Sequence, residues 1–183
     1  HRVCILSFGG SLGARRINEA MADLAQWHTK NRDFYHIHAT GSRGVELFAE
    51  LAKEKGFSGS SHIQVQEYIQ DMPQLLAAAD LVICRAGALT LAELEAAGKA
   101  AVLIPSPNVA ENHQYYNALE LEQAGAAVVI EEKDLTAQKL IEVVDRLTQN
   151  PEQLEQMGRN AKTLAKPDSL DLIADKLEQY LDS

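Results

Sequence analysis

A glycine-rich stretch near the start of the chain has the composition of an anion-binding loop. Phe8-Gly9-Gly10-Ser11-Leu12-Gly13-Ala14 follows an apolar, strand-like run, and a helical pattern begins at about its last residue. Glycines let a backbone approach a ligand closely, and the free N–H groups of a helix N-terminus favour negative charge. The stretch therefore predicts a diphosphate site; the alternative is a tight strand-to-helix turn without a ligand.

A second stretch, Cys84–Glu93, repeats the pattern of a strand, a turn and a helix start. A carboxylate can accept hydrogen bonds from two adjacent hydroxyl groups, so Glu93 is suited to the diol of a ribose. Thr90 and Glu93 also have the spacing of a capping box, in which the glutamate would bond only backbone N–H groups. The spacing by itself favours the capping box.

A third polar stretch, Asn108–Asn117, follows a strand-like run that prolines interrupt, and it opens a helical pattern. His113 and Gln114 carry donors and acceptors suited to sugar hydroxyls. Each is also compatible with an ordinary surface position. Their place beside a strand end keeps both interpretations open.

The histidines and cysteines form no clear metal or disulfide pattern. His36 and His38 place two imidazoles on one face of a strand, because side chains alternate along strands. No third ligand is evident, so we expect the pair to be structural or polar at an edge, and we predict no metal site. Cys4 and Cys84 lie in apolar runs, which is typical of buried reduced thiols.

Strand-like and helical patterns alternate along the chain, which predicts an α/β fold. About six apolar strands with helices on both faces imply a doubly wound, Rossmann-like parallel sheet over residues 1–165. The last third is helical only, and an amphipathic helix, Ser169–Leu181, is expected within the terminal segment 166–183. The expected strands are Arg2–Ser7, Asp33–Ala39, His62–Gln66, Leu81–Arg85, Ala100–Ile104 and Ala126–Ile130. The other expected helices are Ala14–Thr29, Arg43–Lys55, Met72–Ala79, Ala88–Ala97, Asn112–Ala124, a helix from the cap Thr136 to Gln149, and Pro151–Ala165.

The glycine stretch differs from the loops of two common nucleotide-binding classes. A dinucleotide-binding loop has the form G-x-G-x-x-G and is followed by an acidic residue at the end of the second strand. Here the glycines are Gly9, Gly10 and Gly13, and the second strand ends in Ala39-Thr40-Gly41. No lysine of a Walker loop follows the glycines either. Both classes are therefore disfavoured.

Composition and charge exclude further classes of function. The 183 residues carry a formal net charge of −9, which argues against a nucleic-acid partner. No apolar run is long enough to span a bilayer. The chain begins with His1 rather than Met and leads directly into a strand, so we expect it to be a piece of a longer chain.

Three ordered segments resemble the bacterial MurG family of glycosyltransferases. They are Gly9–Asn18, Cys84–Glu93 and His113–Ala118, and the similarity covers roughly residues 2 to 165. The resemblance implies the donor-binding half of a GT-B enzyme that transfers N-acetylglucosamine from its UDP derivative to lipid-linked muramoyl-pentapeptide. It places Ser11, Gly13 and Ala14 at the diphosphate, Ile69 at the uracil, Ala88, Leu89 and Thr90 on the phosphate and sugar side, Glu93 at the ribose in preference to a cap, and His113 and Gln114 at the sugar. Gly10, Asn18 and Arg85, within the matched motifs, are also expected to bind substrate.

The same resemblance implies an inverting reaction. The sequence contains no Asp-x-Asp signature, so we expect that the leaving group needs no divalent metal, and we expect no cofactor. The general base and the lipid-linked acceptor site are expected in the absent N-terminal half, so this fragment should bind donor without turnover. The family works at the cytoplasmic face of the bacterial plasma membrane. Alternatives are a related enzyme such as a diacylglycerol glucosyltransferase, a donor-binding subunit with a membrane partner, or a non-catalytic UDP-sugar module. The terminal helix could cross to the absent domain or mediate self-association.

Overall fold

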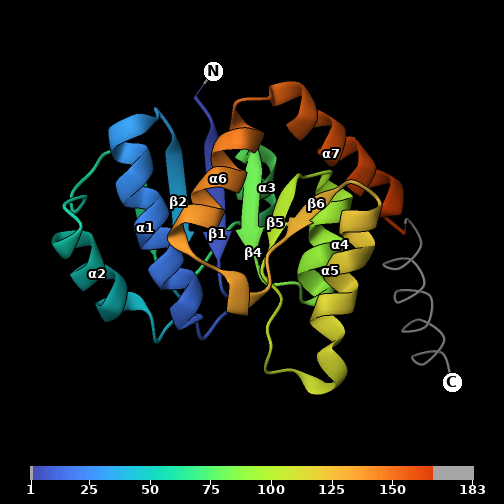
Figure 1. Ribbon diagram of the computed structural model, residues 1–183, viewed down its shortest axis with the longest axis horizontal. Coiled ribbons are helices and arrows are strands. Elements are labelled where there is room, and N and C mark those ends of the chain that lie inside the picture. Colours follow the sequence, from blue (N-terminus) through green and yellow to red (C-terminus); the bar gives the residue numbers. More distant parts are fainter. Residues whose placement is uncertain (1, 167–183) are drawn as a thin grey trace, which may run out of the picture.

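A single parallel sheet organises the computed structural model, which describes residues 2–166 (Figure 1). Its strands are β1 (Cys4–Phe8), β2 (Tyr35–Ala39), β3 (Ile63–Gln66), β4 (Leu81–Cys84), β5 (Ala101–Leu103) and β6 (Ala127–Val129). The α-helices are α1 (Arg15–Asn31), α2 (Val45–Glu54), α3 (Met72–Ala78), α4 (Ala88–Ala97), α5 (His113–Gln123), α6 (Ala137–Thr148) and α7 (Pro151–Leu164), with short 3₁₀ helices η1 (Ala110–Asn112) and η2 (Glu132–Asp134).

The strands lie in the order β3-β2-β1-β4-β5-β6, and every neighbouring pair is parallel. This is the order of a Rossmann-like fold, so the predicted fold class is confirmed. The order reverses between β1 and β4. Loops after these two strands leave the sheet in opposite directions, which opens a crevice at their carboxyl ends where ligands of such folds bind.

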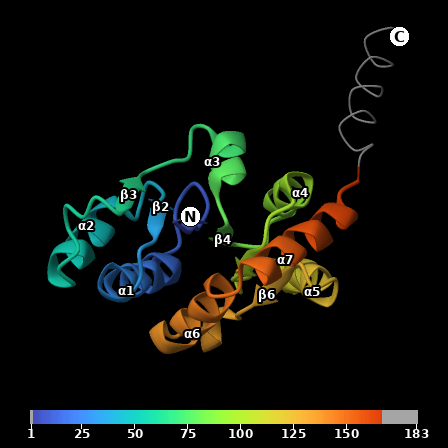
Figure 2. The same cartoon turned by 90° about the horizontal axis from the view of Figure 1, so that it is seen from above.

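Helices cover both faces of the sheet (Figures 1 and 2). One apolar cluster joins the sheet to α1, α2 and α6, and a second joins it to α3, α4 and α5. The central strands are almost wholly apolar because both of their faces are buried, and β4 and β5 are buried at every position. Three polar side chains interrupt this pattern on the α1 side: Ser7, His36 and His38, all with no exposed surface.

The helix ends follow the signals in the sequence closely. Thr136 caps α6 by accepting a hydrogen bond from the Lys139 amide, and Asn150 caps α7 through the Gln153 amide. The observed elements begin and end within two residues of most of the expected bounds. The two 3₁₀ helices were not expected. The predicted helix Ser169–Leu181 lies outside the described residues.

Helix α7 packs against α4 with two glycines at the contact. A Cβ on Gly158 would lie 2.4 Å from the carbonyl oxygen of Gly98, so the two backbones meet without side chains between them. Gly98 ends α4 with φ +63°, in the left-handed region that glycine tolerates best. Over residues 2–166, the helices include none that combines the length and apolar character needed to cross a membrane.

Candidate active site

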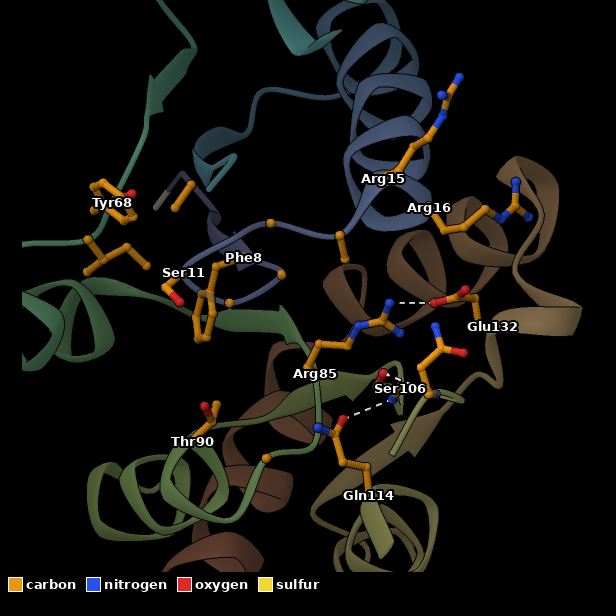
Figure 3. A pocket seen from close by; sticks show the side chains of 18 of the residues that line it. Phe8, Ser11, Arg15, Arg16, Tyr68, Arg85, Thr90, Ser106, Gln114 and Glu132 are labelled. Atoms are coloured by element: carbon orange, nitrogen blue, oxygen red, sulfur yellow. Dashed lines mark hydrogen bonds and ion pairs between the residues drawn. The ribbon is translucent and has the colours of Figure 1, made fainter. Parts of the chain in front are cut away.

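A cavity of about 720 Å³ lies in the crevice between the ends of β1 and β4 (Figure 3). Its walls come from the loops that follow β1, β3, β4 and β5, together with η2. The volume is typical of a site for a small organic ligand. The structure brings eight of the predicted site residues to its lining: Gly10, Ser11, Gly13, Ala14, Ile69, Arg85, Thr90 and Gln114.

The glycine stretch forms one wall. A tight turn is closed by a hydrogen bond of 3.0 Å from the Gly13 amide to the Gly10 carbonyl, and both glycines have positive φ, +95° at Gly10 and +80° at Gly13. Helix α1 begins two residues later, and Ala14 supplies no capping side chain. The amides of the first turn of α1 therefore lack an intrahelical acceptor and can donate to an anion in the cavity.

This wall rests on the turn that follows β2. The Ser42 amide donates to the Ser11 carbonyl at 3.1 Å, and the Arg43 amide donates to the Leu12 carbonyl at 3.2 Å. A Cβ on Gly13 would lie 2.1 Å from the Thr40 carbonyl oxygen, and a Cβ on Gly41 would lie 2.1 Å from the Gly13 nitrogen. The two turns therefore cross in direct backbone contact, which only glycine permits at these positions.

Helix α4 presents a second N-terminus to the cavity. It begins at Ala88 after Gly87, and no side chain caps it. The capping box that the spacing of Thr90 and Glu93 allowed does not form, because Thr90 is the third residue of the helix rather than its cap. Glu93 is half-buried one turn further along, and no hydrogen bond to its carboxylate occurs in the part of the chain that the structure describes.

Arg85 crosses the floor of the cavity. Its guanidinium donates to the carbonyls of Ile104 at 3.2 Å and Pro105 at 3.1 Å, and pairs with Glu132 of η2 (Figure 3). This ion pair was not predicted, because no motif in the sequence links η2 to β4. The ion pair holds Arg85, which directly follows β4, in a fixed orientation and compensates part of its charge.

The remaining walls differ in polarity. Gln114 accepts a hydrogen bond of 2.9 Å from the Ser106 amide, which fixes its side chain at the β5 edge. Tyr68 lies on the opposite side of the cavity from Glu132 and is partly exposed (Figure 3). Ile69, the next residue in the chain, also lines the cavity and makes the lining there more apolar. Such a wall suits the flat face of an aromatic ring. Arg15 and Arg16, on the first turn of α1, lie at the rim, where Glu19 pairs with both and compensates part of their charge.

Five predicted site residues do not line this cavity. Ala88, Leu89 and Glu93 lie on α4 beside it, and Leu89 is 76% exposed. His113 is exposed, and its Nδ1 donates to the Ala110 carbonyl. Asn18 lies behind the glycine turn, where it is 1% exposed.

His36 and His38 belong to the interior rather than to a sheet edge. Ser7 lies between them, and its hydroxyl is 2.7 Å from His36 Nε2 and 2.8 Å from His38 Nδ1. Burial is the largest cause of a pKa below the usual value in both imidazoles, to about 3 for His38. Within residues 2–166, no group of three or more histidine, cysteine or acidic side chains has a metal-binding arrangement.

The two cysteines are free thiols. Cys84 is buried and Cys4 is partly buried, and burial raises the pKa of each thiol above its usual value. A raised pKa keeps a thiol protonated and unreactive. Neither cysteine therefore supplies a nucleophile at the cavity.

Comparisons with known proteins identify a matching family. Residues 4–173 match the glycosyltransferase family 28 C-terminal domain. The chain is 40% identical over 182 residues to the UDP-N-acetylglucosamine--N-acetylmuramyl-(pentapeptide) pyrophosphoryl-undecaprenol N-acetylglucosamine transferase of Desulforamulus reducens, covering 98% of this chain and 49% of that protein. It is 43% identical over 181 residues to the protein of the same name from Desulforudis audaxviator, covering 98% of this chain and 48% of that protein.

The crystal structure of Acinetobacter baumannii MurG superposes with a TM-score of 0.82 at 31% identity, over 98% of this chain and 50% of that one. The chain thus spans about half the length of the relatives that it matches. The family match extends from β1 beyond the last described helix. The chain belongs to the glycosyltransferase family 28 C-terminal domain family.

Proposed function

We propose that this chain binds UDP-N-acetylglucosamine and is the donor half of a glycosyltransferase that transfers N-acetylglucosamine to lipid-linked muramoyl-pentapeptide. The cavity at the β1–β4 crevice, with two uncapped helix N-termini beside it, carries the proposal. Relatives named as N-acetylglucosamine transferases support the choice of sugar and acceptor.

The diphosphate is assigned to the glycine wall. Amides of the first turn of α1 and the start of α4 point their dipoles into a region bordered by Arg15, Arg16 and Arg85. When UDP departs, negative charge grows on its β-phosphate. Amides fixed beforehand stabilise that charge without rearrangement, and loss of one such donor typically costs about 3 kcal/mol of barrier.

The nucleoside is assigned to the end of the cavity opposite the glycine wall. Ile69 lies on the wall suited to the flat face of uracil. Glu93 lies one turn after Thr90, hence on the same side of α4, and its carboxylate has no competing backbone partner among the described residues. Hydrogen bonds from both ribose hydroxyls would satisfy it.

The sugar is assigned to the β5 edge. Gln114 uses its oxygen on the Ser106 amide, so its NH₂ group remains a donor toward a sugar hydroxyl or the acetamido oxygen. Ala88, Leu89 and His113 would complete the contacts once a donor is bound. The general base remains a prediction for another part of the protein, as does the expectation that this chain binds donor without transferring sugar.

Calorimetric titration of this chain with UDP-N-acetylglucosamine, UDP-glucose, UDP and NAD tests the proposal. We expect binding of the uridine ligands, the strongest with the N-acetylglucosamine derivative, and no binding of NAD. Uridine alone serves as the control for the diphosphate contribution. Preference for UDP-glucose would redirect the proposal to another sugar, and tighter binding of NAD would refute it.

A further inference from the structure

A line of buried polar side chains runs through the α1 side of the core to the back of the glycine turn. It joins His28, His36, Ser7, His38 and Asn18. Successive polar atoms are 3.3, 2.7, 2.8 and 2.9 Å apart, and every member is at most 1% exposed. Buried polar groups are costly unless paired, so such a line in an apolar core calls for a structural reason.

The last member of this line, Asn18, is hydrogen-bonded to the backbone beside the proposed diphosphate site. Asn18 Nδ2 donates to the Thr40 carbonyl at 3.0 Å. That carbonyl oxygen occupies the place of the Cβ that Gly13 lacks. A Cβ on Gly44 would lie 2.1 Å from Asn18 Nδ2, so the amide fills the space under the crossing of the two turns. Movement of Asn18 would therefore displace Thr40 and, through it, Gly13.

The direction of every hydrogen bond in the line follows from this contact. Because Asn18 Nδ2 faces a carbonyl, its Oδ1 faces His38 Nε2, which must carry a proton. In a neutral imidazole His38 Nδ1 is then an acceptor, and it accepts a hydrogen bond from the Ser7 hydroxyl. Ser7 in turn accepts from His36 Nε2. The tautomers are thus set from the turn inward.

The far end of the line is left incomplete. His36 Nδ1 accepts from His28 Nε2 at 3.3 Å, and His28 Nδ1 is buried without a hydrogen-bond partner. The hydrogen bonds are therefore shorter and more complete at the end beside the glycine turn. A network whose only purpose was to fill the core would gain more from apolar side chains. Its value lies in the position that it imposes on Asn18.

We propose that Asn18 and His38 are positioning residues for the diphosphate loop: His38 orients the Asn18 amide, and Asn18 holds the Thr40 carbonyl against Gly13. This role rests on the donor-binding function proposed above and replaces the direct substrate contact expected for Asn18. Ordered supporting hydrogen bonds keep ligand-binding groups within a fraction of an ångström of their required place.

The test compares the affinities of this chain for UDP and for uridine, which differ only in the diphosphate. Asn18→Ala removes the contact with Thr40, and His38→Phe removes the donor to Asn18 while keeping a ring against Phe48, whose centroid is 4.5 Å away. His28→Phe is the matched control, because it also replaces a buried histidine, beside Phe34, but at the end far from the turn. Circular dichroism and melting temperature accompany every titration.

We expect Asn18→Ala to lower the UDP affinity by at least about tenfold, and His38→Phe severalfold, with uridine affinity within about twofold of the unsubstituted chain. His28→Phe should lower the melting temperature yet keep the UDP-to-uridine ratio. If the ratio is unchanged in both test variants, or if His28→Phe lowers it equally, the positioning role is refuted. If the unsubstituted chain does not prefer UDP over uridine, the diphosphate site itself is refuted, and the role with it. Should Asn18→Ala not fold, His38→Phe decides.

Discussion

Mild acid should destabilise this domain through its three buried histidines. His28, His36 and His38 have no exposed surface, and burial is the largest cause of a lowered pKa in each, to about 4 for His28 and about 3 for His38. Nearby imidazoles lower the pKa of His28 and His36 further, whereas a hydrogen bond to the backbone of Ser7 partly opposes the shift in His38. All three are neutral in the folded protein at pH 5.

The sign follows from linkage between protonation and folding. The unfolded histidines titrate near pH 6.5, above their folded values, so below that pH the unfolded chain binds more protons and stability falls with decreasing pH. For each histidine, the free energy of unfolding then falls by about 1.4 kcal/mol per pH unit, or by about 2 kcal/mol between pH 6.5 and 5. Three together lose about 6 kcal/mol at most, which is comparable to the whole stability of an ordinary domain. The loss from His28 levels off near pH 4 and that from His38 near pH 3.

Urea unfolding between pH 7.5 and 5 measures this loss, with circular dichroism and the fluorescence of the single tryptophan, Trp27, as probes. Most carboxylates stay ionised over this range, so the slope reports mainly histidines. His28→Phe should reduce the slope by about one third. His113→Gln, at an exposed histidine, should leave it unchanged. An unfolding free energy that is flat from pH 7 to pH 5 would show that the buried histidines are protonated in the folded state or that the line is not formed.

Three further outcomes test the site and the core. Gly13→Ala places a Cβ 2.1 Å from the Thr40 oxygen at φ +80°, so it should lower the free energy of unfolding by more than about 1 kcal/mol and weaken UDP binding. Gly10→Ala has open space at φ +95°, so urea titration should show a smaller loss of stability. Glu93→Gln should weaken UDP about tenfold but leave 2′,3′-dideoxy-UDP unaffected in calorimetry, because the carboxylate is assigned to the diol; equal losses would contradict that assignment. Leu147→Ala, at a fully buried position of α6, should lower the unfolding free energy by about 2–5 kcal/mol while UDP affinity stays unchanged.

The fold could be predicted from local patterns because those patterns agree with one another. Apolar runs, glycine ends and caps such as Thr136 and Asn150 each act over a few residues, and the structure follows them closely. The strand order is not encoded locally; it followed from general rules for alternating strands and helices. The glycine stretch was placed at the cavity for the same reason, since loops after central strands meet at one edge.

Other features depend on contacts between distant segments and gave no local signal. Glu132 reaches Arg85 only because the fold brings η2 close to the end of β5, where Arg85 also donates to the Ile104 carbonyl. Thr90 and Glu93 have the spacing of a capping box, but α4 begins two residues earlier, so the cap does not form. Asn18 was expected to touch substrate because it lies in the glycine motif. Its partners, His38 on β2 and Thr40 directly after β2, become visible only when α1 packs on the sheet.

The meeting of Gly98 and Gly158 bears on how this unit can be cut or recombined. Helix α7 follows the last strand and contributes nothing to the cavity lining, so it looks dispensable for a shortened donor-binding module. Yet its backbone lies directly on the end of α4, the helix that carries Thr90 and Glu93, and it buries Leu154 and Ala161. A chimera or trimmed version that ends before Pro151 would leave α4 without its neighbour. Exchange of this domain between related proteins should therefore keep α4 and α7 from the same parent.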